Sequence, residues 1–232
     1  MKRTIAAAAL LAAGAGSAHA ADLSVKVTNL THGIHYTPFL IAAHGPGTDL
    51  FEPGQAASQS LKQMAECGDI SGLVNDLSAA GADIVENPAG GFLAPGASTT
   101  ATLTTSGGND RLSLTAMLLP TNDGFVGMDS RTLPTEQGTH TYYLNAWDAG
   151  SEANNELLDT SGCTVGMPGI PGAPGGDAGS GGTGVAGSEA NQTVHIHRGN
   201  LGDTSATGGQ SDLDSTVHRW QNPVLKVEVT VQ

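Results

Sequence analysis

The sequence predicts an all-β fold, an antiparallel β-sandwich with a short helical insertion. The first observation is an alternation of apolar and polar residues at 23–30 and 224–232, the pattern of half-buried strands. The second is that five further segments are rich in the β-branched and aromatic residues that strands favour. The third is that helical spacing occurs in one region, whereas a parallel α/β sheet needs a helix after each strand.

Each predicted strand follows from its own pattern. In the first, Leu23, Val25 and Val27 share one face, and the residues between them are polar. The last strand repeats this arrangement, so both ends of the domain are expected to lie in sheets. The segments between them with strand composition are 35–44, 98–106, 111–120, 139–147 and 193–199. At least seven strands are therefore expected.

Helical spacing marks the region from Gln55 to about Ala80. Apolar residues recur there at intervals of three and four, and Gly68 is placed to end the first segment. The region is predicted to form two short helices inserted between strands.

The first 20 residues have the pattern of a secretory signal peptide. Lys2 and Arg3 precede an apolar stretch of small residues that ends in Ala-His-Ala. The apolar stretch is shorter than the roughly 20 residues that a membrane span needs, so no span is expected. The protein is expected to be exported, either to the extracellular space or to the periplasm, with one mature domain over residues 21–232.

The chain contains two cysteines, Cys67 and Cys163. An exported protein meets an oxidising compartment, so a disulfide between them is the simplest expectation. A metal site built on the pair is disfavoured, because the sequence has no C-x-x-C spacing.

Residues 166–190 are rich in glycine and proline. Glycines at 166, 169, 172 and 175 imitate the collagen repeat, which fails at Ala178. Since four triplets cannot form a triple helix, the segment is predicted to be a flexible, disordered loop.

The formal net charge is −13, which argues against nucleic acid as a partner. Such acidity suits either cation binding or solubility in salty surroundings, and composition does not separate the two. The chain has no G-x-S-x-G, no H-E-x-x-H, no P-loop and no dinucleotide-binding fingerprint, so a non-catalytic protein is expected.

Acidic residues gather in two segments that are expected to be loops. Asp148 and Glu152 follow a predicted strand directly, and Asp123 lies in the second segment, 120–130. Calcium takes about six to eight oxygen ligands, which loops at one end of a sandwich can supply together. On spacing alone, the alternative is a set of ordinary solvated turn carboxylates. An EF-hand does not fit, because Ala153 stands where its loop requires glycine.

A second possible metal site lies on the predicted strand 193–199. His195 and His197 are expected to share one face of it, because they are two residues apart. With a third ligand they could bind Zn²⁺ or Cu²⁺, and His218 lies further along the chain. The alternative is an exposed strand face with ordinary polar residues.

Four segments, taken in order, resemble a spondin domain of the kind found in exported bacterial proteins. They are PTNDGFVGMDS, YYLNAWDAGSEANNE, VHIHRG and HRWQNPVLKVEV. In the animal members an Asp precedes an aromatic and apolar run, and a later segment reads Asp-Ala-Gly-Thr-Asp. The more specific feature is the DAG-x-acid motif, which begins 25 residues after the first Asp.

The resemblance implies an extracellular, eight-stranded antiparallel sandwich similar to a C2 domain, with one calcium ion held near one end. Matched residue by residue, the ligands are Asp123, Asp148 and Glu152. Two residues depart from the family pattern, because Gly124 replaces an aromatic residue and Glu152 replaces an Asp. Glu156 is expected to be solvated.

The resemblance also implies a non-catalytic function in adhesion or matrix contact. The expected partner is an extracellular or cell-surface protein or glycan. The alternative function is a transition-metal binding protein, or a metal-dependent enzyme, that uses His195 and His197.

Overall fold

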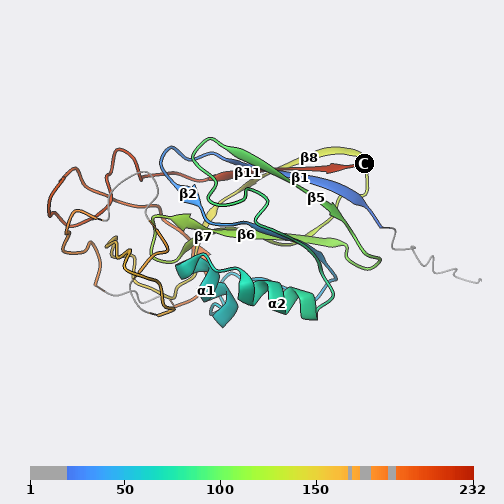
Figure 1. Cartoon of the computed structure of the whole chain (residues 1–232), viewed down its shortest axis with the longest axis horizontal. Helices are drawn as coiled ribbons and strands as arrows, with labels where there is room; N and C mark the ends of the chain where they lie inside the picture. Colours follow the sequence, from blue (N-terminus) through green and yellow to red (C-terminus); the bar gives the residue numbers. More distant parts are fainter. Residues whose placement is uncertain (1–19, 167–168, 173–178, 188–191) are drawn as a thin grey trace, which may run out of the picture.

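Two antiparallel sheets form the two β layers of the computed structural model (Figure 1). One sheet has four strands in the order β5-β1-β11-β8, and the other has seven, with the path β10-β9-β7-β6-β3-β4 and β2 beside β6. The structure describes residues 20–166, 169–172, 179–187 and 192–232. The predicted all-β sandwich is confirmed, whereas the predicted signal peptide lies outside the described residues except for Ala20.

The strand count differs from the eight that the resemblance implied. The smaller sheet consists of β1 (Asp22–Asn29), β5 (Ser98–Thr104), β8 (Gly138–Leu144) and β11 (Leu225–Val231). The larger consists of β2 (His35–Tyr36), β3 (Leu40–His44), β4 (Asp83–Glu86), β6 (Arg111–Leu119), β7 (Gly124–Thr132), β9 (Ala146–Asp148) and β10 (His195–Ile196). The described residues thus form 11 strands, because short pairings add to the number and β9 follows β8 after a single residue.

The first and last strands are neighbours in the smaller sheet. Strand β1 pairs with β11 along its length, with Val25 opposite Val229 and Val27 opposite Val227. All four valines are fully buried, whereas Lys26 and Glu228 form an ion pair on the outer face. The period of two that predicted these strands therefore marks the face that packs on the other sheet.

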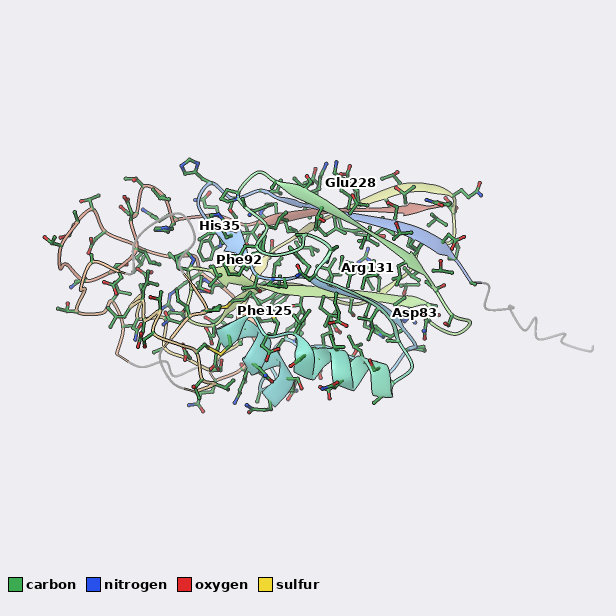
Figure 2. All side chains as sticks on the ribbon, in the orientation of Figure 1. His35, Asp83, Phe92, Phe125, Arg131 and Glu228 are labelled. Carbon is green, nitrogen blue, oxygen red and sulfur yellow. A yellow bond between two sulfur atoms is a disulfide. The ribbon has the colours of Figure 1, made fainter. Side chains whose placement is uncertain are left out.

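The larger sheet separates two apolar cores. On β6, Leu112, Leu114 and Leu118 belong to the core between the sheets, whereas Met117 and Leu119 belong to the core on the opposite face. Helices α1 (Gln59–Cys67) and α2 (Ser71–Ala79) cover that second face (Figure 1). Figure 2 shows how densely side chains fill the space between the two sheets and the space between the larger sheet and the helices. A strand buried on both faces has no polar alternation, as β6 illustrates.

The two predicted helices are confirmed, and their ends have clear causes. The Ser58 side chain accepts a hydrogen bond from Leu61 N at 3.1 Å, which caps the start of α1. Gly68 ends α1 in the left-handed region with a φ of 65°. The predicted disulfide is also confirmed, since Cys67 at the end of α1 is bonded to Cys163. It ties the helical insertion to the segment that follows β9.

One prediction about loops needs correction, and a second stays a prediction. Residues 120–130 were expected to be an acidic loop, but β7 begins at Gly124, so the loop ends at Asp123. Residues 166–190 were expected to be flexible, and much of that segment lies outside the described residues. Within the described part, Ile170 is buried against the helix-side core, and its backbone N–H donates to Asp159 O at 2.7 Å.

No helix in the described part of the chain is both long enough and apolar enough to cross a membrane.

Candidate metal site

Asp123 is fully buried at the point where the chain enters β7. Its Oδ2 accepts hydrogen bonds from the backbone N–H groups of Ser151 at 2.7 Å and Glu152 at 3.0 Å. Its Oδ1 is equally buried and has no hydrogen-bond partner in the described structure. One carboxylate oxygen thus fastens the DAG-x-acid loop, and the other is buried without a hydrogen-bond partner.

Asp148 is brought beside this carboxylate by strand pairing. It is the last residue of β9, where it lies opposite Gly124 of β7 and His195 of β10. The residue is 1% exposed. Its Oδ1 accepts from Gly150 N at 2.8 Å, and its Oδ2 accepts from Asn154 Nδ2 at 2.7 Å. The sheet therefore brings together two acids that lie 25 residues apart in the sequence.

Gly150 explains why the motif requires glycine at its third position. Its φ is 67°, and a Cβ atom there would lie 2.6 Å from both the backbone N and O of Thr193. An L side chain would be strained by the backbone conformation and would collide with the neighbouring segment. Gly150 thus allows the loop to turn tightly enough for Ser151 and Glu152 to reach Asp123.

Glu66 is a fourth acid near this position, and no sequence pattern predicted it. It is fully buried on α1. Its Oε2 accepts a hydrogen bond from Gly166 N at 2.6 Å, whereas its Oε1 is buried without a partner in the described structure. Its charge acts on Glu152, which places the helical insertion beside the acidic loops.

The negative charges of these acids repel one another. Burial, and then the nearby charge of Asp148, raises the pKa of Asp123 to about 7. Burial, and then the charges of Glu66 and Asp123, raises the pKa of Glu152 to about 8. Each buried carboxylate is costly when ionised, and a bound cation would offset that cost.

The acids are close together but are not arranged around a common centre. In the described part of the chain, no group of three or more His, Cys, Asp or Glu side chains stands in a geometry that could hold a metal ion. The unpartnered atoms are Asp123 Oδ1 and Glu66 Oε1, both oxygens, which are the ligands that calcium prefers. The residues therefore fit a hard cation by their chemistry, and their side chains would have to rearrange to surround one.

The two histidines meet the acidic loops at Asp148. His195 Nε2 lies 3.6 Å from Asp148 Oδ2. His197 is 2% exposed, so the expectation of an exposed strand face is wrong for this residue. It is buried because it packs against Trp220, with ring centroids 5.1 Å apart, and against Gly124, where a Cβ would approach the His197 ring at 3.1 Å.

The protonation state expected for His197 is the neutral imidazole. Burial lowers its pKa to about 4, outweighing the opposing effect of the Asp148 charge. Its Nδ1 accepts a hydrogen bond from Gly199 N at 3.0 Å, whereas Nε2 has no partner in the described structure. His218, the third ligand considered, accepts from Asp214 N through its Nδ1 and completes no metal-binding group with the two histidines in the described residues.

Glu156 has a structural role, and the expectation that it is solvated is wrong. The residue is 6% exposed. Its carboxylate accepts hydrogen bonds from Leu201 N, Gly202 N and Ser211 Oγ. These bonds hold the loop before β11 against the acidic segment, and this is why burial is tolerated.

Comparison with known proteins gives one family match. The model of the Spondin_N family matches residues 21–162, which is more than half of the chain. No curated protein matches the sequence. The matched region contains Glu66, Asp123, Asp148 and Glu152, whereas the two histidines and β11 lie beyond it. The chain therefore belongs to the Spondin_N family, as the order of its acidic motifs indicated.

Proposed function

We propose that the protein is an exported, non-catalytic domain that binds calcium at the loops around Asp123 and uses this end of the sandwich for adhesion. Family membership supports the broader part of the proposal, a domain of the extracellular-matrix or adhesion type. The observation that carries the calcium proposal is the fully buried Asp123 carboxylate, with one oxygen bound to the DAG-x-acid loop and the other without a hydrogen-bond partner.

Asp123, Asp148 and Glu152 would hold the ion, and Glu66 would add an oxygen from α1. A divalent cation would offset both the burial of these charges and their mutual repulsion, which together raise the pKa values of Asp123 and Glu152. It would also join β7, the loop after β9 and the helical insertion. Binding is therefore expected to stiffen one end of the sandwich, which would present a fixed surface to a cell-surface or matrix protein or glycan.

Calorimetric titration of the mature protein with Ca²⁺ tests the proposal. We expect saturable heat and a higher melting temperature in calcium. Asp148→Ala should weaken binding by about tenfold to a hundredfold, the effect of losing one charged ligand. Glu66→Gln should also weaken binding, although by less, since one ligand oxygen is retained.

The matched control is Glu136→Gln, which removes one exposed charge beyond the opposite end of β7. It should bind calcium as the wild type does. The absence of both heat and a melting shift in the wild-type protein would refute the calcium proposal.

A second candidate function is transition-metal binding, or metal-dependent catalysis, at His195 and His197. It is supported by the 3.6 Å approach of His195 to Asp148 and by the buried, unpartnered Nε2 of His197. Elemental analysis of protein purified without chelator separates the candidates. Copper or zinc that is lost in His197→Ala would favour this function, and calcium alone would favour the first.

A further inference from the structure

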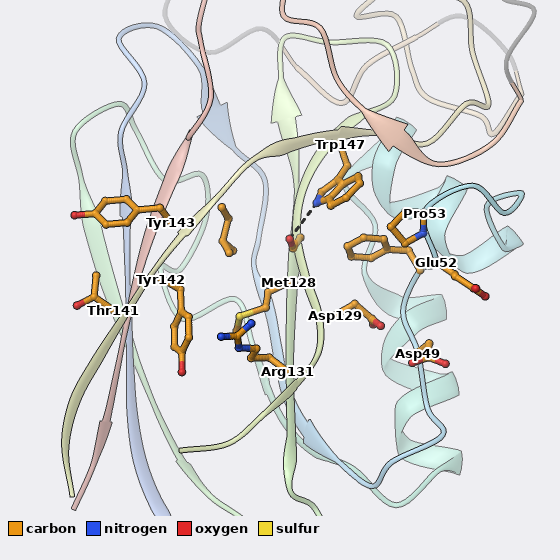
Figure 3. Close-up of a pocket in the computed structure, with 13 residues that line it drawn as sticks. Asp49, Glu52, Pro53, Met128, Asp129, Arg131, Thr141, Tyr142, Tyr143 and Trp147 are labelled. Carbon is orange, nitrogen blue, oxygen red and sulfur yellow. Dashed lines mark hydrogen bonds between the residues drawn. The ribbon is translucent and has the colours of Figure 1, made fainter. Parts of the chain in front are cut away.

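A groove of about 810 Å³ opens at the side of the sandwich where β8 diverges from β7 (Figure 3). The two strands are consecutive but belong to different sheets. After Asn145 the chain continues into β9, which pairs with β7 over Gly124–Val126. Within the described residues, the remainder of β7 pairs with β6 alone, and β8 pairs with β11 alone. The groove is therefore bordered by two strand edges that pair with no further strand in the described residues, and on the β7 edge Gly127 O already accepts a hydrogen bond from a side chain.

Aromatic side chains form both walls of the groove. Trp147 donates its Nε1–H to Gly127 O at 3.2 Å, which fixes the indole. Phe51 packs against this ring, with centroids 5.3 Å apart. Tyr142 of β8 stands on the other side, whereas the neighbouring Tyr143, which is 61% exposed, points away from Trp147 (Figure 3). The two walls thus carry rings from different parts of the chain, Trp147 and Phe51 on one side and Tyr142 on the other.

The groove lining is acidic. It contains the carboxylates of Asp49, Glu52 and Asp129 and a single cation, Arg131. Asp129 is held by a hydrogen bond from Leu50 N at 2.6 Å. Burial, partly offset by that bond, and the charge of Asp49 raise the pKa of Asp129 to about 6. A positive group in the groove would relieve this repulsion.

Arg131 illustrates the chemistry that the walls accept. Its guanidinium carbon lies 5.0 Å from the centroid of the Tyr142 ring. This distance is that of a cation–π contact, in which a ring face attracts a positive charge. The opposite wall repeats the combination of ring and charge, with Trp147 and Phe51 beside Glu52, but has no cation of its own among the lining residues.

We propose that the groove binds an extended, basic segment of a partner protein. A lysine or arginine side chain would lie beside Trp147 and near the carboxylates of Asp49 and Glu52, and the main chain would follow the free edge of β7. Addition of a strand to an open edge supplies hydrogen bonds along the backbone, and the pockets supply specificity. The proposal goes beyond calcium binding and does not depend on it, because Trp147 and Asp148 point to opposite faces of β9.

A basic peptide is favoured over a sugar by two observations. Sugars stack on aromatic rings, but a neutral sugar gains nothing from a lining with three carboxylates and one cation. The open edges of β7 and β8 also match a peptide backbone, which a sugar cannot pair with in register.

Fluorescence anisotropy with labelled eight-residue peptides tests the proposal. One peptide alternates lysine with valine, a second has glutamine in place of each lysine, and cellohexaose serves as an unlabelled competitor. The full mature protein is used, in calcium and in chelator. We expect saturable binding of the lysine peptide in both conditions, with at least about tenfold preference over the glutamine peptide.

Two double variants locate the binding. The double variant Asp49→Asn/Glu52→Gln removes two exposed charges of the groove. It should lower the affinity for the lysine peptide by about tenfold. Asp110→Asn/Glu136→Gln removes two exposed charges elsewhere, and should change binding less than about twofold.

Three results would overturn the proposal. They are equal affinity for the lysine and glutamine peptides, equal weakening by both double variants, and displacement of the peptide by cellohexaose. The second would mean that the acidic surface as a whole attracts the peptide, and the third that the groove is a sugar site. Loss of calcium binding with retained peptide binding would leave this proposal standing and would refute only the earlier one.

Discussion

In the absence of calcium, the protein is expected to lose stability as the pH rises from about 5 to about 8. The cause is the raised pKa of Asp123, to about 7, and of Glu152, to about 8. A carboxyl group with a higher pKa in the folded state binds its proton more tightly there. Its stabilising effect is complete below the unfolded pKa of about 4 and is lost as the pH rises through the folded value.

Asp123→Asn should remove most of this pH dependence. The amide oxygen can still accept from Ser151 N and Glu152 N, so the loop contact is kept while the buried charge is lost. In chelator at pH of about 8 the variant should be more stable than the wild type by on the order of 2–4 kcal/mol. Urea unfolding at several pH values measures the difference.

Calcium should reverse the order of the two proteins. At a calcium concentration about 1,000 times the Kd, the wild type gains about 4.1 kcal/mol, and the variant gains little because it has lost a charged ligand. The two proteins therefore exchange rank between chelator and calcium. An Asp123→Asn protein that is less stable in both conditions would show that the carboxylate has only a structural role, and Glu136→Gln should show no exchange of rank.

Removal of the disulfide is expected to have the largest effect on stability. The bond between Cys67 and Cys163 spans 96 residues. In the chain-entropy model, loss of a crosslink over a loop of this length lowers the free energy of unfolding by about 4–5 kcal/mol. The Cys67→Ser/Cys163→Ser protein should show this loss in urea unfolding, and the reduced wild type should behave in the same way.

The disulfide should also affect calcium binding. It holds the segment that carries Gly166, whose N–H donates to Glu66 Oε2 at 2.6 Å. Without the crosslink, the segment that carries Gly166 would be less restrained. The hydrogen bond from Gly166 N would then hold the Glu66 side chain less firmly beside the acidic loops. We expect weaker calcium binding in the double serine protein. A stability loss below about 1 kcal/mol together with unchanged calcium affinity would contradict both parts of this prediction.

The parts of the fold with a local pattern were predictable from the sequence. Strands β1 and β11 each bury one face, so their residues alternate, and α1 combines a serine cap with a glycine stop. Strand β7 has no such pattern, since its first five residues are all buried. Strand β7 also contains Gly127, a residue that is not typical of strands. Glycine is needed at this position because a Cβ there would lie 2.6 Å from the Phe51 ring.

The candidate site was predictable only in part, for a different reason. Asp123, Asp148 and Glu152 could be recognised because they belong to acidic segments that follow one another in the order typical of the family. Glu66 is held by a residue 100 positions away, and no nearby residue indicates that contact. The burial of His197 likewise depends on Trp220 from a distant loop. Contacts between residues far apart in the sequence determine these environments, and the local sequence pattern does not indicate such contacts.

Strand β9 has a consequence for how the two proposed binding events would relate. Within three residues it carries a wall of the groove, at Trp147, and a candidate calcium ligand, at Asp148. It is paired on both sides, by β7 and β10. Thermodynamic reciprocity requires that if calcium changes the affinity for peptide by some factor, peptide changes the affinity for calcium by the same factor. A short strand clamped between two neighbours is the element through which such coupling would pass.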